Sequence, residues 1–315
     1  MARREIIIDC DPGHDDALAI LLALASAEEV EVLAITAVAG NVPLALTAAN
    51  ARAVVELAGR RDLPVHAGCA RPLVRELVTA EYIHGRSGLD GADLPAPTLP
   101  LAAAHAVDAL IELVRARPPG SVTLCTLGPL TNVGMALLKA PDLAPRLKEI
   151  VLMGGAVGEG NTTPAAEFNI YVDPHAAKLV FEAGVPLTMF GLDVTHQALV
   201  TPARLAAIRA LGTPVSAAVT GLLEFYNIYD QTRRGRPGAP LHDPCTIAWL
   251  LRPELFSGRA CHVAIETRGE HTLGRTVVDW SGRREVPANA MVIDRMDDDG
   301  FFALLTERFA RLPLS

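Results

Sequence analysis

The sequence is poor in aromatic residues and in positive charge. Phe, Trp and Tyr make up 4% of the 315 residues, and the two tryptophans are Trp249 and Trp280. The formal net charge is −8 at pH 7 and the arginines are scattered, which argues against a nucleic-acid partner. Half of the residues are hydrophobic, mainly Ala, Leu and Val, and this composition suits helices packed on a parallel sheet.

Long apolar runs and paired cysteines are also absent. No segment reaches about 18 consecutive apolar residues, so no membrane span is expected. The apolar run behind the basic N-terminal residues ends at Asp9, which is too short for a signal peptide. The cysteines lie far apart without a C-x-x-C pair, at Cys10, Cys69, Cys125, Cys245 and Cys261. This pattern favours reduced thiols, and we expect a soluble cytoplasmic protein.

Short β-branched runs alternate with helical patterns over most of the chain, as in a doubly wound α/β sheet. Strands are predicted at 6–8, 30–38, 64–67, 121–126, 149–153 and 187–190, and helices at 44–57, 102–116, 130–139 and 174–183. Two stretches, 79–100 and 225–242, are predicted to be irregular and therefore to act as binding loops. Strands at 262–267, 276–279 and 290–293, with a helix at 301–311, are expected to form a small C-terminal β extension. The sequence predicts one domain, 1–315, with an open, mostly parallel sheet and helices on both faces.

Four aspartates fall within eight positions near the N-terminus: Asp9, Asp11, Asp15 and Asp16. They follow a predicted strand, a Pro-Gly turn separates them, and an apolar helical stretch comes next. Such a turn crowds carboxylates at the carboxyl end of a strand, where open α/β sheets bind ligands. Because each charge disfavours ionisation of the others, a cation is needed to hold them together. The cluster therefore predicts a metal site.

Three alternative roles compete with this metal site. Asp15 or Asp16 taken singly could simply complement a helix N-terminus. An EF-hand loop that starts at Asp9 would need Gly at its sixth and Glu at its twelfth position, but His14 and Ile20 stand there. An Asp-x-Asp phosphotransferase could use Asp9 or Asp11 as nucleophile, but the following Pro-Gly-His-Asp-Asp does not resemble that family.

Further polar residues stand at or after the ends of later predicted strands. They are Asn41, Thr126, Asn161, Glu167, Asn169, His242 and Asp243. Each has a structural explanation taken alone: Asn41 and Asn161 as turn formers, and Asp243 as a helix N-cap before Pro244. His242 alone would more often be a satisfied loop histidine. Their shared position at the carboxyl ends of strands favours one binding site.

These segments together resemble the inosine–uridine-preferring nucleoside hydrolase family. The resemblance rests on four motifs in the family's order and spacing, namely Asp-Cys-Asp-Pro-Gly-His-Asp-Asp-Ala, Leu-Met-Gly-Gly, Ala-Glu-Phe-Asn and Leu-His-Asp-Pro, which begin at residues 9, 152, 166 and 241. It covers residues 6 to about 250, and the Asp-rich opening is its most specific part. It implies an N-ribohydrolase that converts a ribonucleoside and water to ribose and a free base, in nucleoside salvage.

The resemblance also implies roles for the residues. One Ca²⁺ per chain would be held by Asp11, Asp16, Asp243 and the backbone carbonyl of Thr126, an all-oxygen set that suits a hard cation. Asp11 would accept the proton of the attacking water, and His242 would be the acid for the leaving base. The resemblance assigns further residues to the substrate: Asp15, Asn41, Asn161, Glu167 and Asn169 to ribose, Met153 and Phe168 to the sugar pocket, and His84, Tyr229 and Arg233 to the base.

Substrate preference and assembly are less constrained. Purine-specific relatives stack the base between tryptophans, and the predicted places of Trp249 and Trp280 argue against that branch. His242 supports the pyrimidine-preferring or broad branch instead. A hydrolase of another N-riboside, such as nicotinamide riboside, and a non-catalytic nucleoside- or ribose-binding homologue stay open as alternatives. The family resemblance suggests a homo-oligomer, a tetramer or a dimer.

Overall fold

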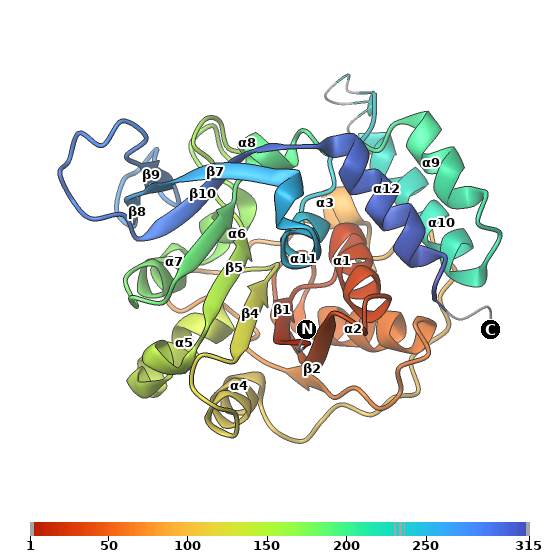
Figure 1. The fold of residues 1–315 in the computed structure, drawn as a ribbon, viewed down its shortest axis with the longest axis horizontal. Coiled ribbons are helices and arrows are strands. Elements are labelled where there is room, and N and C mark those ends of the chain that lie inside the picture. Colours follow the sequence, from red (N-terminus) through yellow and green to blue (C-terminus); the bar gives the residue numbers. More distant parts are fainter. Residues whose placement is uncertain (1–2, 230, 233–234, 236, 313–315) are drawn as a thin grey trace.

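An eight-stranded sheet forms the centre of the molecule (Figure 1). The computed structural model describes residues 3–229, 231–232, 235 and 237–312. The strand order is β3-β2-β1-β4-β5-β6-β10-β7, in which every neighbouring pair is parallel except β10 and β7. These strands are β1 (Arg4–Cys10), β2 (Val30–Ala37), β3 (Val65–Ala67), β4 (Val122–Thr126), β5 (Glu149–Met153), β6 (Leu187–Phe190), β7 (Phe256–Cys261) and β10 (Ala290–Met296). A separate antiparallel pair consists of β8 (Val263–Ile265) and β9 (Thr276–Val278).

Helices cover both faces of the sheet (Figure 1). The first half of the chain contains α1 (His14–Leu24), α2 (Leu44–Leu57), α3 (Glu81–His84), α4 (Ala106–Arg115), α5 (Thr131–Lys139) and the 3-10 helix η1 (Pro141–Arg146). The second half contains α6 (Phe168–Val172), α7 (Pro174–Phe181), α8 (Leu192–Thr195), α9 (Pro202–Arg209), α10 (Pro214–Tyr229), α11 (Pro244–Leu251), η3 (Pro253–Leu255) and α12 (Asp298–Phe309).

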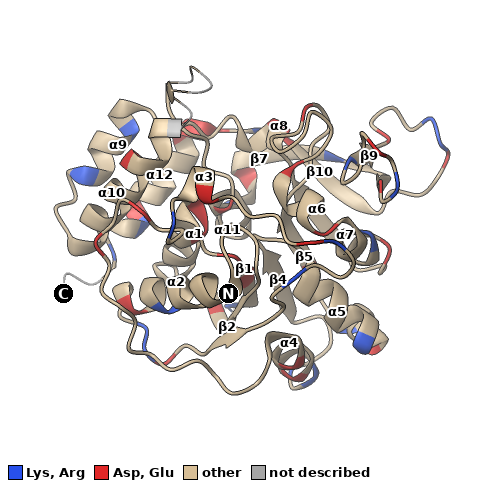
Figure 2. Cartoon of the chain, turned by 180° about the vertical axis from the view of Figure 1, so that it is seen from behind, with Lys and Arg blue, Asp and Glu red and all other residues tan. Residues whose placement is uncertain are grey.

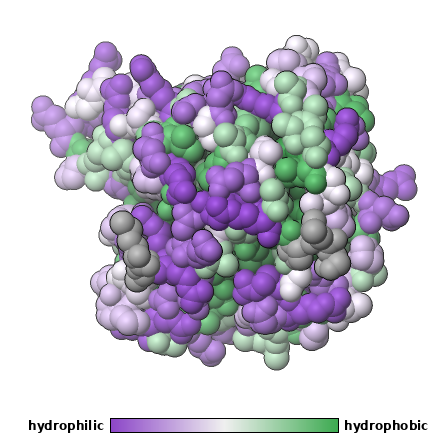
Figure 3. Space-filling view, turned by 45° about the vertical axis from the view of Figure 1, so that its right-hand side comes forward, coloured by the Kyte–Doolittle hydropathy of each residue, from purple (hydrophilic) through white to green (hydrophobic). Residues whose placement is uncertain are grey.

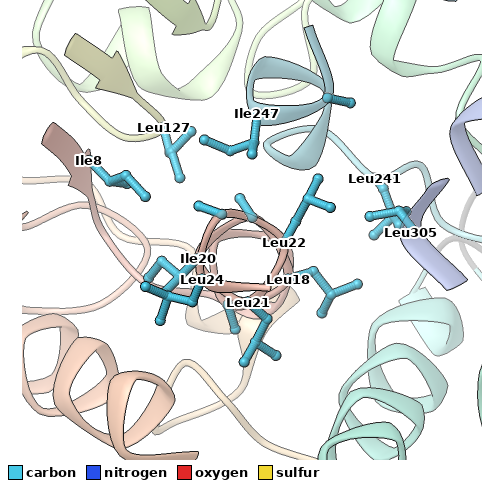
Figure 4. Packing of buried hydrophobic residues seen from close by; sticks show 14 of the residues in the cluster. Ile8, Leu18, Ile20, Leu21, Leu22, Leu24, Leu127, Leu241, Ile247 and Leu305 are labelled. Carbon is cyan, nitrogen blue, oxygen red and sulfur yellow. The ribbon is translucent and has the colours of Figure 1, made fainter. Parts of the chain in front are cut away.

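The alternation of side chains along β1 explains why the core has two halves. Ile6 and Ile8 point into a hydrophobic cluster shared with α1, α2, α10, α11 and α12, whereas Ile7 points into a second cluster shared with α4, α5 and α7. Successive side chains of a strand face opposite sides, so a continuous apolar strand supplies both layers. Helix α1 is buried along its whole length, and Figure 4 shows its leucines among Ile8 of β1, Ile247 of α11 and Leu305 of α12.

The connections from β1 place the aspartate-rich turn at the centre of the sheet. The chain builds outward from β1 through β2 to β3 and then returns to β4 on the other side of β1. This reversal between β1 and β4 is a topological switch point, where open α/β sheets form a crevice beyond the carboxyl ends of the strands. Asp11 follows β1 directly at this crevice.

The architecture confirms the predicted fold class and corrects four details. The segment 290–293 belongs to β10, which pairs with β6 in the main sheet, so only β8 and β9 form the small extension. Strand β7 was not predicted. The prediction of irregular structure over 225–242 was wrong for its first residues, because α10 continues to Tyr229; the stretch 79–100 likewise contains the short helix α3.

The outside of the molecule is mixed in polarity. Figure 3 shows one face as a mosaic of hydrophilic and hydrophobic residues. The acidic residues at α1 and α3 stand near the centre of the view in Figure 2. Among the described residues, no helix is both long and apolar enough to span a bilayer. All five cysteines are free.

Candidate active site

Four buried carboxylates converge where β1, α1 and α11 meet. Asp11 lies in the turn after β1, Asp15 and Asp16 lie in the first turn of α1, and Asp243 directly precedes α11. Asp15, Asp16 and Asp243 each offer an oxygen within 4.8 Å of the others. Asp243 occupies the N-cap position of α11 but makes no side-chain capping hydrogen bond. Its carboxylate therefore serves the cluster rather than the helix.

Backbone N–H groups fix Asp16 and Asp11. Asp16 Oδ1 accepts from the N–H of Asp11 at 3.2 Å, and its Oδ2 accepts from the N–H of Gly13 at 3.0 Å. Asn41 donates its N–H to Asp11 Oδ2 at 2.7 Å and its side-chain amide to Asp16 Oδ2 at 3.2 Å. Asn41 is thus more than a turn former, because it links the end of β2 to both acids.

Two glycines leave room for the Asp11 side chain. A Cβ atom at Gly40 would lie 2.0 Å from Asp11 Oδ2, and one at Gly128 would lie 2.3 Å from Asp11 Oδ1. No larger residue fits the loops after β2 and β4 without displacing this carboxylate. The crevice is therefore shaped around Asp11.

The four acids are held in an electrostatically costly arrangement. Burial raises the pKa of Asp11 and of Asp243 well above the usual range, and repulsion from Asp16 and from Asp15 respectively adds to it. Burial and the charge of Asp16 raise the pKa of Asp15 to about 7, and burial also raises the pKa of Asp16. None of the ion pairs formed among the described residues involves these acids.

A hard divalent cation fits this cluster. Asp11 Oδ1 is buried and has no hydrogen-bond partner among the described residues, as expected for an oxygen that serves as a metal ligand. The donors are all oxygens, which is the ligand type of Ca²⁺ and Mg²⁺. Thr126 ends β4 beside Asp9 of β1. The carboxylates with oxygens close to one another include Asp15, which the family resemblance assigned to ribose, and do not include Asp11.

Asp9 stands apart from the other aspartates. Its Oδ1 accepts from Thr36 Oγ1 at 2.6 Å and from Asn132 Nδ2 at 2.8 Å. These bonds connect β1 to β2 and to α5. Burial raises the pKa of Asp9 to about 7.

A pocket of about 620 Å³, including its open mouth, lies above the carboxylates. Ten predicted site residues line it: Asp15, Asn41, His84, Met153, Asn161, Glu167, Phe168, Asn169, His242 and Asp243. Asp11, Asp16 and Thr126 are not part of this lining. Tyr229 is the last residue of α10; its side chain and the whole of Arg233 lie outside the described residues.

One wall of the pocket is organised by Glu167. Its carboxylate accepts from the N–H groups of Gly155 at 2.9 Å, Asn169 at 2.9 Å and Ile170 at 3.1 Å, which caps α6. Burial raises the pKa of Glu167 to about 7. The amide of Asn169 donates to the carbonyl oxygen of Leu127 at 2.6 Å. Glu167 and Asn169 thus join the loops after β4 and β5 in one polar wall.

His242 occupies a different wall. Its Nδ1 lies 2.7 Å from Thr195 Oγ1 in α8, and its ring meets the ring of His196 edge-on at 5.7 Å between centroids. The side chain is buried yet lines the pocket. The hydroxyl of Thr195 therefore fixes the ring plane of His242.

Aromatic rings gather around His84. His14 stacks on His84, on Phe225 and on Tyr226, with centroids 5.2, 5.4 and 5.3 Å apart. Burial lowers the pKa of His14 to about 4 and that of His84 well below its usual value. Both rings are therefore neutral at physiological pH.

Sequence reasoning missed several residues that line the pocket. They are Ala80, Tyr82, Ile83, Leu127, Thr162 and Tyr226. The aromatic segment Phe-Tyr-Asn-Ile-Tyr that begins at residue 225 carried a signal for Tyr226, which the prediction of an irregular loop obscured.

Comparisons with known proteins agree with this geometry. A family model described as inosine-uridine preferring nucleoside hydrolase matches residues 6–303. The pyrimidine-specific ribonucleoside hydrolase RihA of Shewanella woodyi is 51% identical over 96% of this chain and 97% of its own length. An uncharacterized protein of Schizosaccharomyces pombe is 50% identical over 98% of this chain and 100% of its own. Among solved structures, a purine-preferring ribonucleoside hydrolase from Gardnerella vaginalis superimposes with a TM-score of 0.91 at 32% identity, covering 98% of this chain and 99% of that one.

Proposed function

Because this chain belongs to the inosine-uridine preferring nucleoside hydrolase family and hydrolyses N-glycosyl bonds of ribonucleosides, we propose that it acts on pyrimidine nucleosides with one bound Ca²⁺. The observation that carries the proposal is the cluster of three buried carboxylates, Asp15, Asp16 and Asp243, beside Asp11 and next to a pocket with a polar wall. The family match and the unbroken main sheet support one hydrolase domain over 1–315.

Asp11, Asp16 and Asp243 would hold the ion, together with the backbone carbonyl of Thr126, as the family resemblance implies. Asp15 has an oxygen within 4.8 Å of oxygens of Asp16 and Asp243 and is placed to contribute. Their mutual repulsion and the orphaned Oδ1 of Asp11 support this assignment. A bound Ca²⁺ supplies positive charge that favours ionisation of a nearby water.

Asp11 accepts a proton from the attacking water while the oxygen of that water forms a bond to C1′ of ribose. The bond from C1′ to the base nitrogen breaks, through a sugar with oxocarbenium character. Asp15, Asn41, Asn161, Glu167 and Asn169 bind the ribose hydroxyls, so that binding energy favours the distorted ring. Met153 and Phe168 supply the apolar surface for the sugar.

His242 gives its proton to the departing base. Its hydrogen bond with Thr195 orients the ring, and its place in the pocket wall puts it within the substrate's space. A histidine suits this step because small environmental shifts keep its pKa near neutrality.

A preference for pyrimidines is supported by the relative RihA and by the positions of the tryptophans. Trp249 packs edge-on against Phe190 and Phe256, and Trp280 lies beneath the guanidinium of Arg259. Neither lines the pocket. The base is held instead by His84 and Tyr226, with Tyr229 and Arg233 proposed to approach it from the adjoining segment.

The remaining proposals concern the cellular context. Five free thiols support a reducing, cytoplasmic location. The partners would be small nucleosides rather than nucleic acid, in keeping with the net charge of −8. We propose a homo-oligomer, a tetramer or a dimer, as in the family.

A substrate panel tests the function. The protein is incubated with uridine, cytidine, inosine and nicotinamide riboside, and free ribose is followed over time. Ribose released fastest from uridine or cytidine supports the proposal. Faster release from inosine or nicotinamide riboside contradicts the base preference, and no release from any substrate contradicts the enzymatic function.

A further inference from the structure

The short helix α8 contacts two separate walls of the pocket. It begins by donating the backbone N–H of Leu192 to the carbonyl oxygen of Gly155, in the loop after β5, at 2.9 Å. At its other end, the hydroxyl of Thr195 lies 2.7 Å from Nδ1 of His242. Asp193 stands two positions before Thr195, and residues two positions apart lie on opposite sides of a helix. The side of α8 that carries Asp193 is therefore not the side that holds His242.

The carboxylate of Asp193 holds the loop after β5 through two consecutive backbone groups. Its Oδ2 accepts from the N–H of Val157 at 2.6 Å, and its Oδ1 accepts from the N–H of Gly158 at 3.0 Å. A Cβ atom at Gly158 would lie 3.1 Å from Asp193 Oδ1, so the lack of a side chain there permits the close approach. Hydrogen bonds from N–H groups to a carboxylate are stronger than those between neutral groups. Asp193 therefore fixes the loop near the point where it leaves the sheet.

Helix α8 is itself tied to the main sheet by Gln197. The side-chain nitrogen of Gln197 donates to the carbonyl oxygens of Asp193 at 2.9 Å and of Asp294 in β10 at 2.8 Å. Its side-chain oxygen accepts from the N–H of Met296, also in β10, at 3.3 Å. The loop after β5 is thus held by a helix whose own position is set by β10.

Asn161 is the pocket residue whose position depends on this loop. It lies three residues after Gly158 and lines the pocket. Its Oδ1 accepts from the backbone N–H of Phe168 at 2.9 Å. A backbone N–H only donates, so this bond turns the amide oxygen toward Phe168 and leaves the NH₂ group to donate to a ligand. Asn161 therefore has a fixed amide orientation, and the loop that Asp193 holds sets its place along the wall.

We propose that Asp193 is a positioning residue for ribose binding: it holds the loop after β5 on α8 so that the amide of Asn161 donates to a ribose hydroxyl. Asp193 is not part of the pocket lining, so it acts through Asn161. Helix α8 then supports both parts of the substrate, the ribose through Asp193 and the departing base through Thr195. This inference rests on the proposed function, in which Asn161 binds ribose.

A double-mutant cycle separates positioning from general stabilisation of the fold. Ribose affinity is measured by calorimetry of the calcium-loaded wild type, Asp193→Ala, Asn161→Ala and the double variant. We expect Asp193→Ala to weaken ribose binding about tenfold, the effect of losing one hydrogen bond to the ligand. In the Asn161→Ala background the same change should cost less than about twofold, because the two residues act through one contact. Additive losses overturn the proposal.

Two further variants control for the loss of the carboxylate. Asp193→Asn keeps one acceptor oxygen, so its affinity should lie between those of the wild type and Asp193→Ala, and it replaces Asp193→Ala in the cycle if that variant does not fold. Asp279 likewise accepts from two consecutive N–H groups, those of Arg283 at 2.9 Å and Arg284 at 2.7 Å, in a loop outside the pocket. Asp279→Asn should therefore leave ribose affinity within about twofold of wild type. A loss as large as that of Asp193→Asn overturns the proposal.

Kinetics with two substrates locate the effect within the pocket. Uridine and p-nitrophenyl riboside share the ribose, so Asp193→Asn should lower kcat/KM by the same factor for both. A loss confined to uridine would place the effect on departure of the base and overturn the proposal. A wild type that binds ribose but releases none from any nucleoside contradicts the proposed function, and the ribose cycle still decides this inference. A wild type that binds no ribose overturns the inference.

Discussion

The hydroxyl of Thr276 both donates to and accepts from the backbone of a single residue, Ala156. Thr276 Oγ1 lies 2.6 Å from the carbonyl oxygen of Ala156 and 2.9 Å from its nitrogen. Thr276 belongs to β9, and Ala156 lies in the loop after β5 that leads to Asn161 and Glu167. The small C-terminal sheet therefore holds the loop that carries one wall of the pocket.

Removing this hydroxyl should impair the pocket more than the fold. Thr276→Val keeps the side-chain shape but leaves two buried backbone groups without a partner, a cost of about 1–3 kcal/mol. We expect kcat/KM for uridine to fall on the order of tenfold, measured by ribose release. Thr276→Ser restores the hydroxyl and should recover most activity. Equal kinetics for the Val variant and wild type would show that the clamp does not position the loop.

The space around Asp11 gives a second prediction. In Gly128→Ala, the new methyl group meets Asp11 Oδ1 at 2.3 Å and must displace it. A displacement of this size at a reacting group costs on the order of a hundredfold in rate. Steady-state kinetics and calcium titration should both show the loss. Gly212→Ala is the control, because it strains a φ of 66° with no atom nearby and should leave activity intact. An active Gly128→Ala enzyme would contradict the tight packing around Asp11.

Glu167 predicts a pH dependence of stability. Burial raises its pKa from 4.5 to about 7, so the folded state binds a proton that the unfolded chain has already lost in this window. Stability from this group is complete below pH 4.5 and declines as the pH rises through 7. Glu167→Gln has no carboxyl group to titrate, so its free energy of unfolding should not show this decline. Between pH 4.5 and 7 the variant's free energy of unfolding should therefore rise relative to that of the wild type by on the order of 3 kcal/mol. Urea unfolding at fixed calcium measures both proteins, and parallel pH profiles would refute the shift.

An ion pair between buried Arg308 and partly exposed Glu29 should contribute to stability. Nη1 of Arg308, a side chain 2% exposed, lies 2.6 Å from Glu29 Oε2, and Arg252 reaches the other oxygen. Glu29→Gln removes the nearer counter-ion of the buried guanidinium and leaves only Glu307, at 4.0 Å, so we expect the free energy of unfolding to fall by about 3 kcal/mol. Arg252→Gln removes only a more exposed partner and should cost less than about 1 kcal/mol. Equal effects in thermal or urea unfolding would show that burial of Arg308 is not decisive.

Elements set by local pattern could be predicted from the sequence. The bounds of α2, β5 and β6 coincide with the prediction because each has a clear periodicity and flanking turn residues. The place of β10 could not be predicted, since its pairing with β6 joins segments about a hundred residues apart. Helix α10 was not predicted, and its last residues were assigned to an irregular stretch; in the fold, Phe225 and Tyr226 continue the helix and stack on His14.

The candidate site could likewise be predicted where local sequence determines it, but not where distant segments meet. The carboxylates near the N-terminus could be predicted because four of them lie close together in the sequence. The later polar residues could be predicted because they follow predicted strands. The link between His14 and His84 left no trace in the sequence, because 70 residues separate two histidines that each have an ordinary local role. A contact between residues this far apart in the sequence can be identified only from the structure.

The decisive measurement is ribose release from uridine by the calcium-loaded wild type and by Asp11→Ala, with Asp62→Ala as a control that removes an exposed carboxylate paired with Arg60. The wild type and the control should each release one ribose for every uracil, at similar rates. Asp11→Ala should lose turnover because the attacking water then has no proton acceptor. A wild-type kcat in Asp11→Ala, or no ribose from the wild-type protein, would contradict the proposed active site.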